Sequence, residues 1–323
     1  MKVLVTGGAG YVGSMVTRAL LTAGHQVRVL DSLLHTGSAL LSLLPEDGFE
    51  FVRGDVRSAG TLQAAVTGMD GVVHLAAIVG DPACARDPEL ARAVNLDASL
   101  RLFELSQSAG VQRFVFASTC SNYGRMKDPT AYVDEESELS PVSLYAETKV
   151  AVEKALLAHP RGVNPAVTVL RLATVYGLSP RMRFDLTVNE FTMELLTKKK
   201  VVIFGEQFWR PYIHVRDVAR AIALVFARPA EMVAGQVFNV GDTRENYQKG
   251  TLAELIRTEI GNGATIERVA RNEDPRDYRV AFERIHDVLG YEITRTVPDG
   301  VKEIASAIDQ GVLTDLDART YRN

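Results

Sequence analysis

The stretch KVLVTGGAGYVG, residues 2–13, starts with a run of mostly β-branched and leucine side chains and continues into spaced glycines. An unbroken apolar run of this kind is typical of a strand that is buried on both faces of a sheet. Gly7, Gly10 and Gly13 follow this strand and open a helix-like segment. Glycines here let the backbone turn tightly and let a pyrophosphate reach the N–H groups of the helix N-terminus. The stretch, which includes Tyr11 and Val12, therefore predicts a dinucleotide-binding site.

Strand-like and helix-like segments alternate through the rest of the first half of the chain. Such a βαβαβ order predicts a parallel, doubly wound sheet. We therefore expect an α/β fold, with a Rossmann-like NAD-binding domain over residues 1–178 and a smaller, irregular C-terminal substrate lobe over 179–323. Residues 210–240 are expected to return to the first domain, and the ligands to lie at the carboxyl ends of the strands. The expected strands are 2–7, 26–31, 49–55, 71–77, 113–119 and 166–177.

Composition argues against nucleic-acid binding, a disulfide or metal framework, and insertion into a membrane. The 323 residues carry a net charge of -4, and the longest basic run is Lys198–Lys200, so nucleic acid is not an expected partner. The two cysteines, Cys84 and Cys120, form neither a disulfide framework nor a metal-ligand pattern. No signal peptide and no apolar run of about 20 residues is visible, so we expect a cytoplasmic protein that does not enter a membrane.

Asp31 ends the second predicted strand, 18 residues after Gly13. A carboxylate at this place can accept hydrogen bonds from the ribose hydroxyls of an adenosine, and it repels the additional phosphate of NADP. The expected cofactor is therefore NAD. Asp55 and Val56, after the third strand, are expected near the adenine.

Tyr145 and Lys149 lie four residues apart on one predicted helix, so they share a face. The spacing alone is weak evidence, but here it accompanies a dinucleotide site and the hydroxyl-rich strand end FASTCSNYG, residues 116–124. A lysine ammonium stabilises a tyrosine phenolate, which can remove a proton from a substrate hydroxyl. The pair therefore predicts a site that oxidises or reduces an alcohol carbon.

Together with HLAA (74–77), Asn95 and the C-terminal stretches WRPYIHVRDVARAI and DPRDYRVAFERIHDVLGY, these motifs resemble the extended short-chain dehydrogenase/reductase family. The similarity is to its NAD-dependent nucleotide-sugar epimerases and dehydratases, of the UDP-glucose 4-epimerase kind. It implies that Thr119 shares the substrate proton with Tyr145 and that Ser118 lies beside it. It also implies cofactor contacts for Leu75, Ala76, Ala77, Asn95 and Tyr176.

The two positions after Thr119 bear on the reaction. In the family's 4,6-dehydratases these positions typically hold Asp and then Glu, whereas this chain has Cys120 and Ser121. Without those carboxylates the simplest chemistry is 4-epimerisation through a transient 4-keto sugar. A 4,6-dehydratase and a 4-ketoreductase remain as alternatives. A thiolate of Cys120 can act as an acid or base, but packing of a small buried side chain is the preferred interpretation.

The resemblance further implies a nucleotide-diphosphate sugar as substrate and a homodimer formed through helices 92–107 and 143–157. Arginine suits the diphosphate because its planar guanidinium matches phosphate oxygens. Thr174 stands where many relatives carry a substrate-binding Asn. The substrate-side residues expected from the resemblance are Ser118, Cys120, Ser121, Thr174, Asn189, Arg210 and Arg276.

Overall fold

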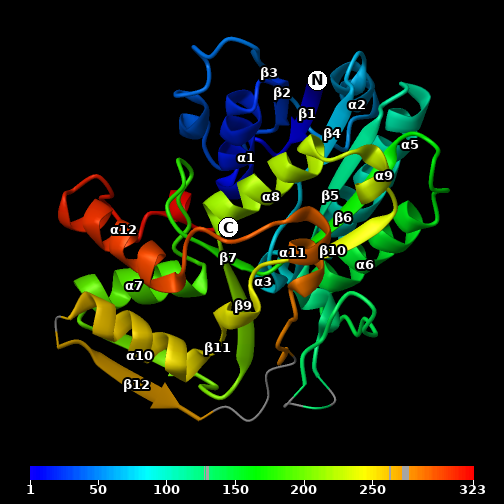
Figure 1. Ribbon diagram of the computed structural model, residues 1–323. Coiled ribbons are helices and arrows are strands. Elements are labelled where there is room, and N and C mark those ends of the chain that lie inside the picture. The colour runs from blue at the N-terminus through cyan, green and yellow to red at the C-terminus, as the bar shows by residue number, and fades with distance from the viewer. Residues whose placement is uncertain (127, 129–130, 262, 271–275) are drawn as a thin grey trace.

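The computed structural model describes residues 1–126, 128, 131–261, 263–270 and 276–323. Its largest sheet has seven parallel strands in the order β10-β6-β5-β4-β1-β2-β3, with the chain reversing its direction of travel across the sheet at β1 and β4 (Figure 1). This order confirms the predicted doubly wound sheet. The strands are β1 (Lys2–Thr6), β2 (Gln26–Asp31), β3 (Phe49–Arg53), β4 (Gly71–His74), β5 (Arg113–Thr119), β6 (Ala166–Leu172) and β10 (Gln236–Val240).

Alternate side chains of the strands enter two separate cores. In β1, Val3 and Val5 pack into one hydrophobic cluster, while Leu4 packs into the other. The first cluster includes α1 (Tyr11–Thr22) and α8 (Val215–Ala227), which contact each other on one face of the sheet. The second includes α2 (Ala59–Val66), α5 (Ala98–Ser108) and α6 (Leu144–Leu157) on the opposite face. Burial on both faces explains why Val3, Leu4 and Val5 form an unbroken apolar run in β1.

The predicted strand 166–177 is in fact two strands. β6 ends at Leu172, and β7 (Thr174–Tyr176) leaves the large sheet to pair with β9 (Trp209–His214). At the break, the N–H of Ala173 still bonds the carbonyl of Val240 on the neighbouring β10. The sequence pattern did not reveal this break, because β-branched and apolar residues continue from β6 into β7.

The C-terminal half supplies two small sheets and a group of helices. β9 also pairs with β11 (Asn246–Gln248), and β8 (Lys200–Phe204) pairs with β12 (Thr265–Val269). The helices α7 (Thr187–Thr197), α10 (Lys249–Ile260) and α12 (Val297–Asp309) pack against one another at the lower left of Figure 1. The remaining helices are α3 (Asp81–Arg86), α4 (Pro88–Arg92), α9 (Ala230–Val233) and α11 (Glu283–Leu289).

Two later elements join the first half of the chain. β10 pairs with β6 as the edge strand of the large sheet, and α8 lies against α1. β9, however, belongs to a small sheet with β7 and β11. The division of the chain at residue 178 stays a prediction.

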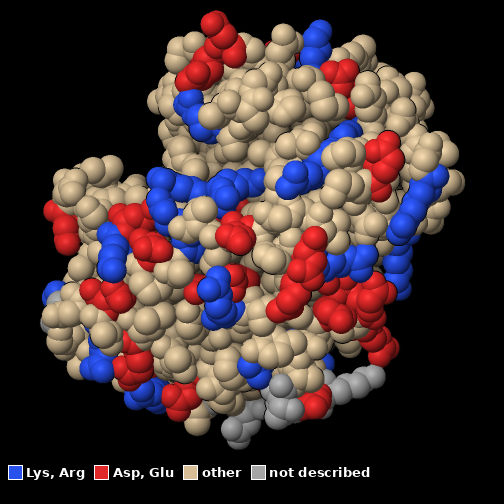
Figure 2. Space-filling model, in the orientation of Figure 1, with Lys and Arg blue, Asp and Glu red and all other residues tan. Residues whose placement is uncertain are grey.

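On the face shown in Figure 2, clusters of Asp and Glu side chains lie beside Lys and Arg side chains. A face that carries both signs of charge gives no electrostatic reason to expect a polyanion there. Within the described residues, none of the helices combines the length and apolar character that a membrane crossing needs.

The packing of α1 on the sheet predicts a measurable contrast between two leucines. Leu20 on α1 is 0% exposed, whereas Leu44 in a loop is 56% exposed. Leu20→Ala should lower the free energy of unfolding by about 2–5 kcal/mol, because it leaves a cavity in the core. Leu44→Ala should change it by less than about 0.5 kcal/mol. Urea denaturation followed by circular dichroism measures both, and equal losses would contradict this assignment of the core.

Candidate active site

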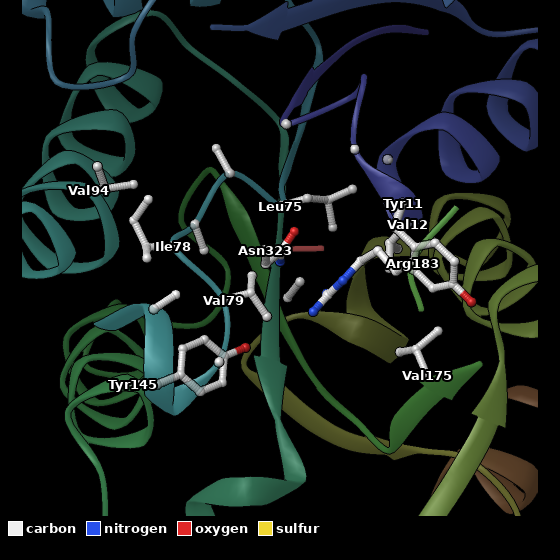
Figure 3. A pocket seen from close by; sticks show the side chains of 18 of the residues that line it. Tyr11, Val12, Leu75, Ile78, Val79, Val94, Tyr145, Val175, Arg183 and Asn323 are labelled. Carbon is white, nitrogen blue, oxygen red and sulfur yellow. The ribbon is translucent and has the colours of Figure 1, made fainter. Parts of the chain in front are cut away.

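A cavity of about 800 Å³ lies at the carboxyl ends of the strands of the large sheet. Gly7 after β1, Asp31 at the end of β2, Leu75 after β4 and Thr119 at the end of β5 all line it. Figure 3 shows the hydroxyl of Tyr145 and the guanidinium of Arg183 pointing into this space from opposite sides. The predicted residues that the structure brings together around it are Gly7, Gly10, Tyr11, Val12, Gly13, Asp31, Asp55, Val56, Leu75, Ala76, Ala77, Ser118, Thr119, Ser121, Tyr145, Lys149, Thr174 and Arg276.

The glycine loop forms a cradle that only glycine can build. Gly7 has φ +75°, and a Cβ there would lie 2.8 Å from the backbone nitrogen of Ala76. A Cβ on Gly13 would lie 2.0 Å from the carbonyl oxygen of Gly7. Gly10 is the N-cap of α1 and offers no side-chain bond to the first turn, so N–H groups of that turn are open to a ligand. These features fit a pyrophosphate at the helix N-terminus.

Asp31 is fixed at the edge of the cavity by two backbone N–H groups. Ala9 donates to one carboxylate oxygen at 3.0 Å and Leu33 to the other at 2.8 Å. The remaining lone pairs of the carboxylate fit ribose hydroxyls. Asp55 also lines the cavity and accepts hydrogen bonds from the guanidinium of Arg57. The cradle and Asp31 together fit a dinucleotide without a phosphate on its adenosine ribose.

A buried hydrogen-bond chain supports the loop after β4. Nδ1 of His74 bonds Thr6 Oγ1 at 2.6 Å, and Nε2 bonds Ser99 Oγ at 2.8 Å. Burial, with a smaller effect from Lys149, lowers the pKa of His74 to about 3, so the ring is neutral and hydrogen-bonded. This arrangement holds the HLAA segment in place beneath the cavity.

Asn95, expected among the cofactor contacts, lies behind the cavity wall. It is part of the π-helix Ala93–Asp97 and is 0% exposed. Its side-chain amide pairs with the backbone of Ile78, accepting from the N–H at 2.8 Å and donating to the carbonyl at 2.9 Å. Asn95 therefore shapes the cavity through the backbone of the loop that lines it.

Three predicted catalytic residues meet at the inner end of the cavity. Tyr145 and Lys149 come from α6, and Thr119 comes from the end of β5. Thr119 Oγ1 accepts from the N–H of Ser121 at 3.1 Å, which leaves its own O–H available to a substrate oxygen. Ser118 has a different role, because its hydroxyl donates to the buried carboxylate of Glu153.

The Lys149 ammonium stands close to Tyr145 without bonding it. Nζ donates to the carbonyl of Ala117 at 2.9 Å and lies 6.0 Å from the centre of the Tyr145 ring. Burial raises the pKa of Tyr145, and Arg183 acts in the opposite direction. Catalytic hydrogen bonds are often long in ligand-free proteins and tighten when the substrate binds.

Cys120, one of the substrate-side candidates, does not line the cavity. The side chain is 1% exposed, packs in the core and donates its S–H to the carbonyl of Arg171 at 3.3 Å. Burial raises the pKa of this thiol well above its ordinary value. The position of Cys120 in the core agrees with the preferred interpretation, packing of a small buried side chain.

Tyr176, Asn189 and Arg210 also lie outside the cavity wall. Tyr176 is fully buried against the ring of His214, at 5.3 Å between centres, because β7 turns away from the large sheet. Asn189 is buried and bonds the carbonyl of Arg183 at 2.8 Å. Arg210 is 6% exposed, and its guanidinium lies 5.3 Å from the centre of the Tyr278 ring.

The cavity wall also contains residues that the sequence analysis did not single out. Tyr278 lines it and its hydroxyl lies 3.3 Å from Ser121 Oγ. Asp81 forms an ion pair with Arg276 at 3.2 Å. Arg322 and Asn323 also line the cavity. Tyr278 lies in the DPRDY stretch that carried the resemblance, but no sequence pattern pointed to the last two residues.

The family profile described as "NAD dependent epimerase/dehydratase family" matches residues 3–241 of this chain. A relative from Bacillus subtilis, named as an uncharacterized UDP-glucose epimerase, YtcB, is 31% identical over 96% of this chain and 100% of its own length. The dTDP-glucose 4,6-dehydratase of Streptomyces niveus is 32% identical over 94% of this chain and 91% of its own. The two similarities are equally strong, so they support the family and not one reaction.

Solved structures give the same result. The UDP-glucose 4-epimerase of Thermotoga maritima, determined with UDP-glucose, has a TM-score of 0.85 at 27% identity and covers 97% of this chain and 100% of its own. The dTDP-glucose 4,6-dehydratase DesIV of Streptomyces venezuelae, determined with NAD and TYD, has a TM-score of 0.85 at 27% identity, over 98% and 100%. With the glycine cradle, Asp31 and the Tyr145–Lys149 pair at one cavity, this protein belongs to the NAD-dependent epimerase/dehydratase family of extended short-chain dehydrogenase/reductase enzymes.

Proposed function

We propose that this enzyme is a 4-epimerase of nucleotide-linked sugars that acts through a transient 4-keto sugar. The observation that carries the proposal is the composition of the inner end of the cavity. Tyr145, Lys149 and Thr119 line it together, while the two residues after Thr119 bring no carboxylate: Cys120 faces the core and Ser121 is close to Tyr278.

These residues can carry out the proton transfers of that reaction. Thr119 donates its O–H to the C4 oxygen of the sugar and orients it toward Tyr145. The Tyr145 phenolate removes the proton from the C4 hydroxyl as general base and later returns it as general acid. When bound, NAD supplies a hydride acceptor at C4 and gives the hydride back, so the reaction has no net oxidation. C4 inverts when the keto sugar presents its other face for reduction.

Lys149 supplies the positive charge that favours the phenolate. It is 3% exposed, and its Nζ lies 4.7 Å above the centre of the Phe116 ring, on the same face of α6 as Tyr145. A charge that is shielded from solvent acts over a longer distance than it would in water, because the dielectric constant around it is lower. Small movements of Tyr145 toward a bound sugar therefore bring its oxygen under the influence of this ammonium.

The two alternatives differ from the epimerase in different ways. A 4,6-dehydratase requires an acid and a base near C5 and C6 of the sugar. Asp81 is a carboxylate in the cavity wall, but it is paired with Arg276. A 4-ketoreductase uses the same Tyr145 and Thr119 as the epimerase, but it consumes NADH and releases NAD in each turnover.

A proton NMR time course with added NAD on UDP-, dTDP- and GDP-hexoses tests the proposal. Signals of the C4-inverted sugar are expected from one of these substrates. A new high-field methyl doublet would instead identify a 4-keto-6-deoxy product and a dehydratase. Accumulation of NADH in step with a keto sugar would identify an oxidoreductase.

Tyr145→Phe is the matched variant for the same assay. It should lower turnover about 10²–10⁴-fold, because it removes the acid–base group, and it should leave NAD affinity within a few-fold. Val150→Ala, five residues further along α6, changes packing without removing a proton-transfer group and serves as the control. Full activity of Tyr145→Phe would refute the mechanism.

The buried charge of Lys149 also predicts a pH dependence of stability. Burial lowers the pKa of Lys149 to about 8 from 10.5. Below pH 8 the folded chain carries the whole cost of the buried ammonium. Between about pH 8 and 10.5 the folded chain has lost this proton, whereas the unfolded chain keeps it. The contribution of this group to the free energy of unfolding therefore rises with pH in this range.

Lys149→Met should therefore be more stable than the wild type at pH 7 by up to about 3 kcal/mol. The difference should shrink as the pH rises from 8 to 10. Thermal denaturation of both proteins without added ligand measures it. Lys154→Met, on the exposed side of the same helix, is the control and should show no such trend. A constant difference across this pH range would contradict the assignment.

We further propose that the enzyme is a cytoplasmic homodimer. Exposed and half-buried positions of α5 and α6, such as Leu100 and Ala151, are available to a second copy. Light scattering after size-exclusion chromatography should give about twice the mass of one chain. Leu100→Asp should shift the population toward the monomer, and a monomeric wild type would refute this proposal.

A further inference from the structure

The loop 177–183 is fastened to the first turn of α1, at the place where the glycine cradle opens. Ser179 Oγ donates to the carbonyl of Tyr11 at 2.7 Å and lies 3.1 Å from Ser14 Oγ. The Tyr11 hydroxyl donates to the carbonyl of Gly177 at 2.6 Å. The loop therefore keeps a constant position relative to the N-terminus of α1, where a pyrophosphate is expected.

This loop carries a buried arginine for which the described part of the chain offers no counter-ion. Arg181 lines the cavity and is only 3% exposed. No described residue hydrogen-bonds its Nε, and Nη2 donates to the carbonyl of Arg322 at 3.2 Å. Among the described residues it forms no ion pair, whereas the neighbouring Arg183 is paired with Asp185 at 2.8 Å.

An isolated buried guanidinium is costly unless an anion compensates it. Burial, together with the charge of Arg183, lowers the pKa of Arg181 to about 10, so the side chain is still charged at neutral pH. Asp31 and Asp185 act on it from a distance with the opposite sign. The arginine is therefore on the cofactor side of the cavity, near the residue expected to bind the adenosine ribose.

Residues 321–323 contact Arg181 and the two residues that follow the loop 177–183. The carbonyl of Tyr321 accepts from the N–H of Phe184 at 2.9 Å, and the two rings lie edge to face at 5.4 Å. The N–H of Asn323 donates to Asp185 at 3.2 Å. Figure 3 shows Asn323 at the cavity beside Arg183. These residues lie beyond the segment that the family profile matches.

We infer that Arg181 is the counter-ion of the cofactor pyrophosphate, opposite the N-terminus of α1, and that residues 321–323 are part of the cofactor site because they hold the Arg181 loop. The pyrophosphate would lie between the N–H groups of the glycine cradle and the unpartnered Nε of Arg181. The inference rests on NAD as the cofactor and is independent of which sugar reaction the enzyme performs.

Isothermal titration calorimetry tests the inference. The full chain, freed of bound nucleotide, is titrated with ADP-ribose, adenosine and UDP. Arg181→Gln should lower the affinity for ADP-ribose by about tenfold or more, since a charge-assisted hydrogen bond is lost. It should lower the affinity for adenosine by less than about twofold. Deletion of residues 321–323 should give the same selective loss. Arg319→Gln removes an exposed cation from the same C-terminal segment, outside the cavity wall, and should change neither affinity.

Three results would overturn the inference. Unchanged ADP-ribose affinity in Arg181→Gln would show that the arginine does not meet this pyrophosphate. Equal losses for ADP-ribose and adenosine would show a general distortion of the site. A loss confined to UDP would assign Arg181 to the substrate diphosphate. Failure of the proposed epimerase activity leaves all of these titrations unaffected, so the two proposals can fail separately.

Discussion

The geometry of the active site depends on the buried ion pair between Glu153 on α6 and Arg171 on β6. Their side chains are 1% and 5% exposed, with N and O 3.0 Å apart. Ser118 at the end of β5 donates to the same carboxylate. Removing one partner of such a pair leaves an uncompensated buried charge, at a cost of about 3–5 kcal/mol. The pair therefore holds α6, with Tyr145 and Lys149 on it, in one position against the sheet.

The opposite wall of the cavity is built differently. There the N-terminus of α1, the loop 177–183 and residues 321–323 meet, although they are far apart in the chain. Hydrogen bonds from side chains to backbone carbonyls connect them, and Arg181 brings a positive charge that the described residues do not neutralise. A buried ion pair thus orders the wall that carries Tyr145 and Lys149, whereas the other wall keeps a charge for an anionic ligand.

This division explains how one scaffold can serve several reactions. The cofactor wall and the Tyr145–Lys149–Thr119 group suit any reaction that begins by oxidising C4 of a sugar, which fits the equal similarity to epimerases and dehydratases. The fate of the resulting 4-keto sugar depends on acids and bases near the neighbouring carbons. Cys120 and Ser121 contribute neither, since one side chain is in the core and the other is close to Tyr278.

The sequence by itself determined the features that depend on local spacing: the glycine cradle, Asp31 at a strand end, and Tyr145 and Lys149 on one helical face. Such patterns are set by the periods of strand and helix. Only the tertiary structure decided which way buried side chains face, as Tyr176, Asn189, Arg210 and Cys120 show. It alone also placed Arg322 beside Arg181, 141 residues away in the chain. Contacts of that range arise from the packing of whole elements, which no local pattern records.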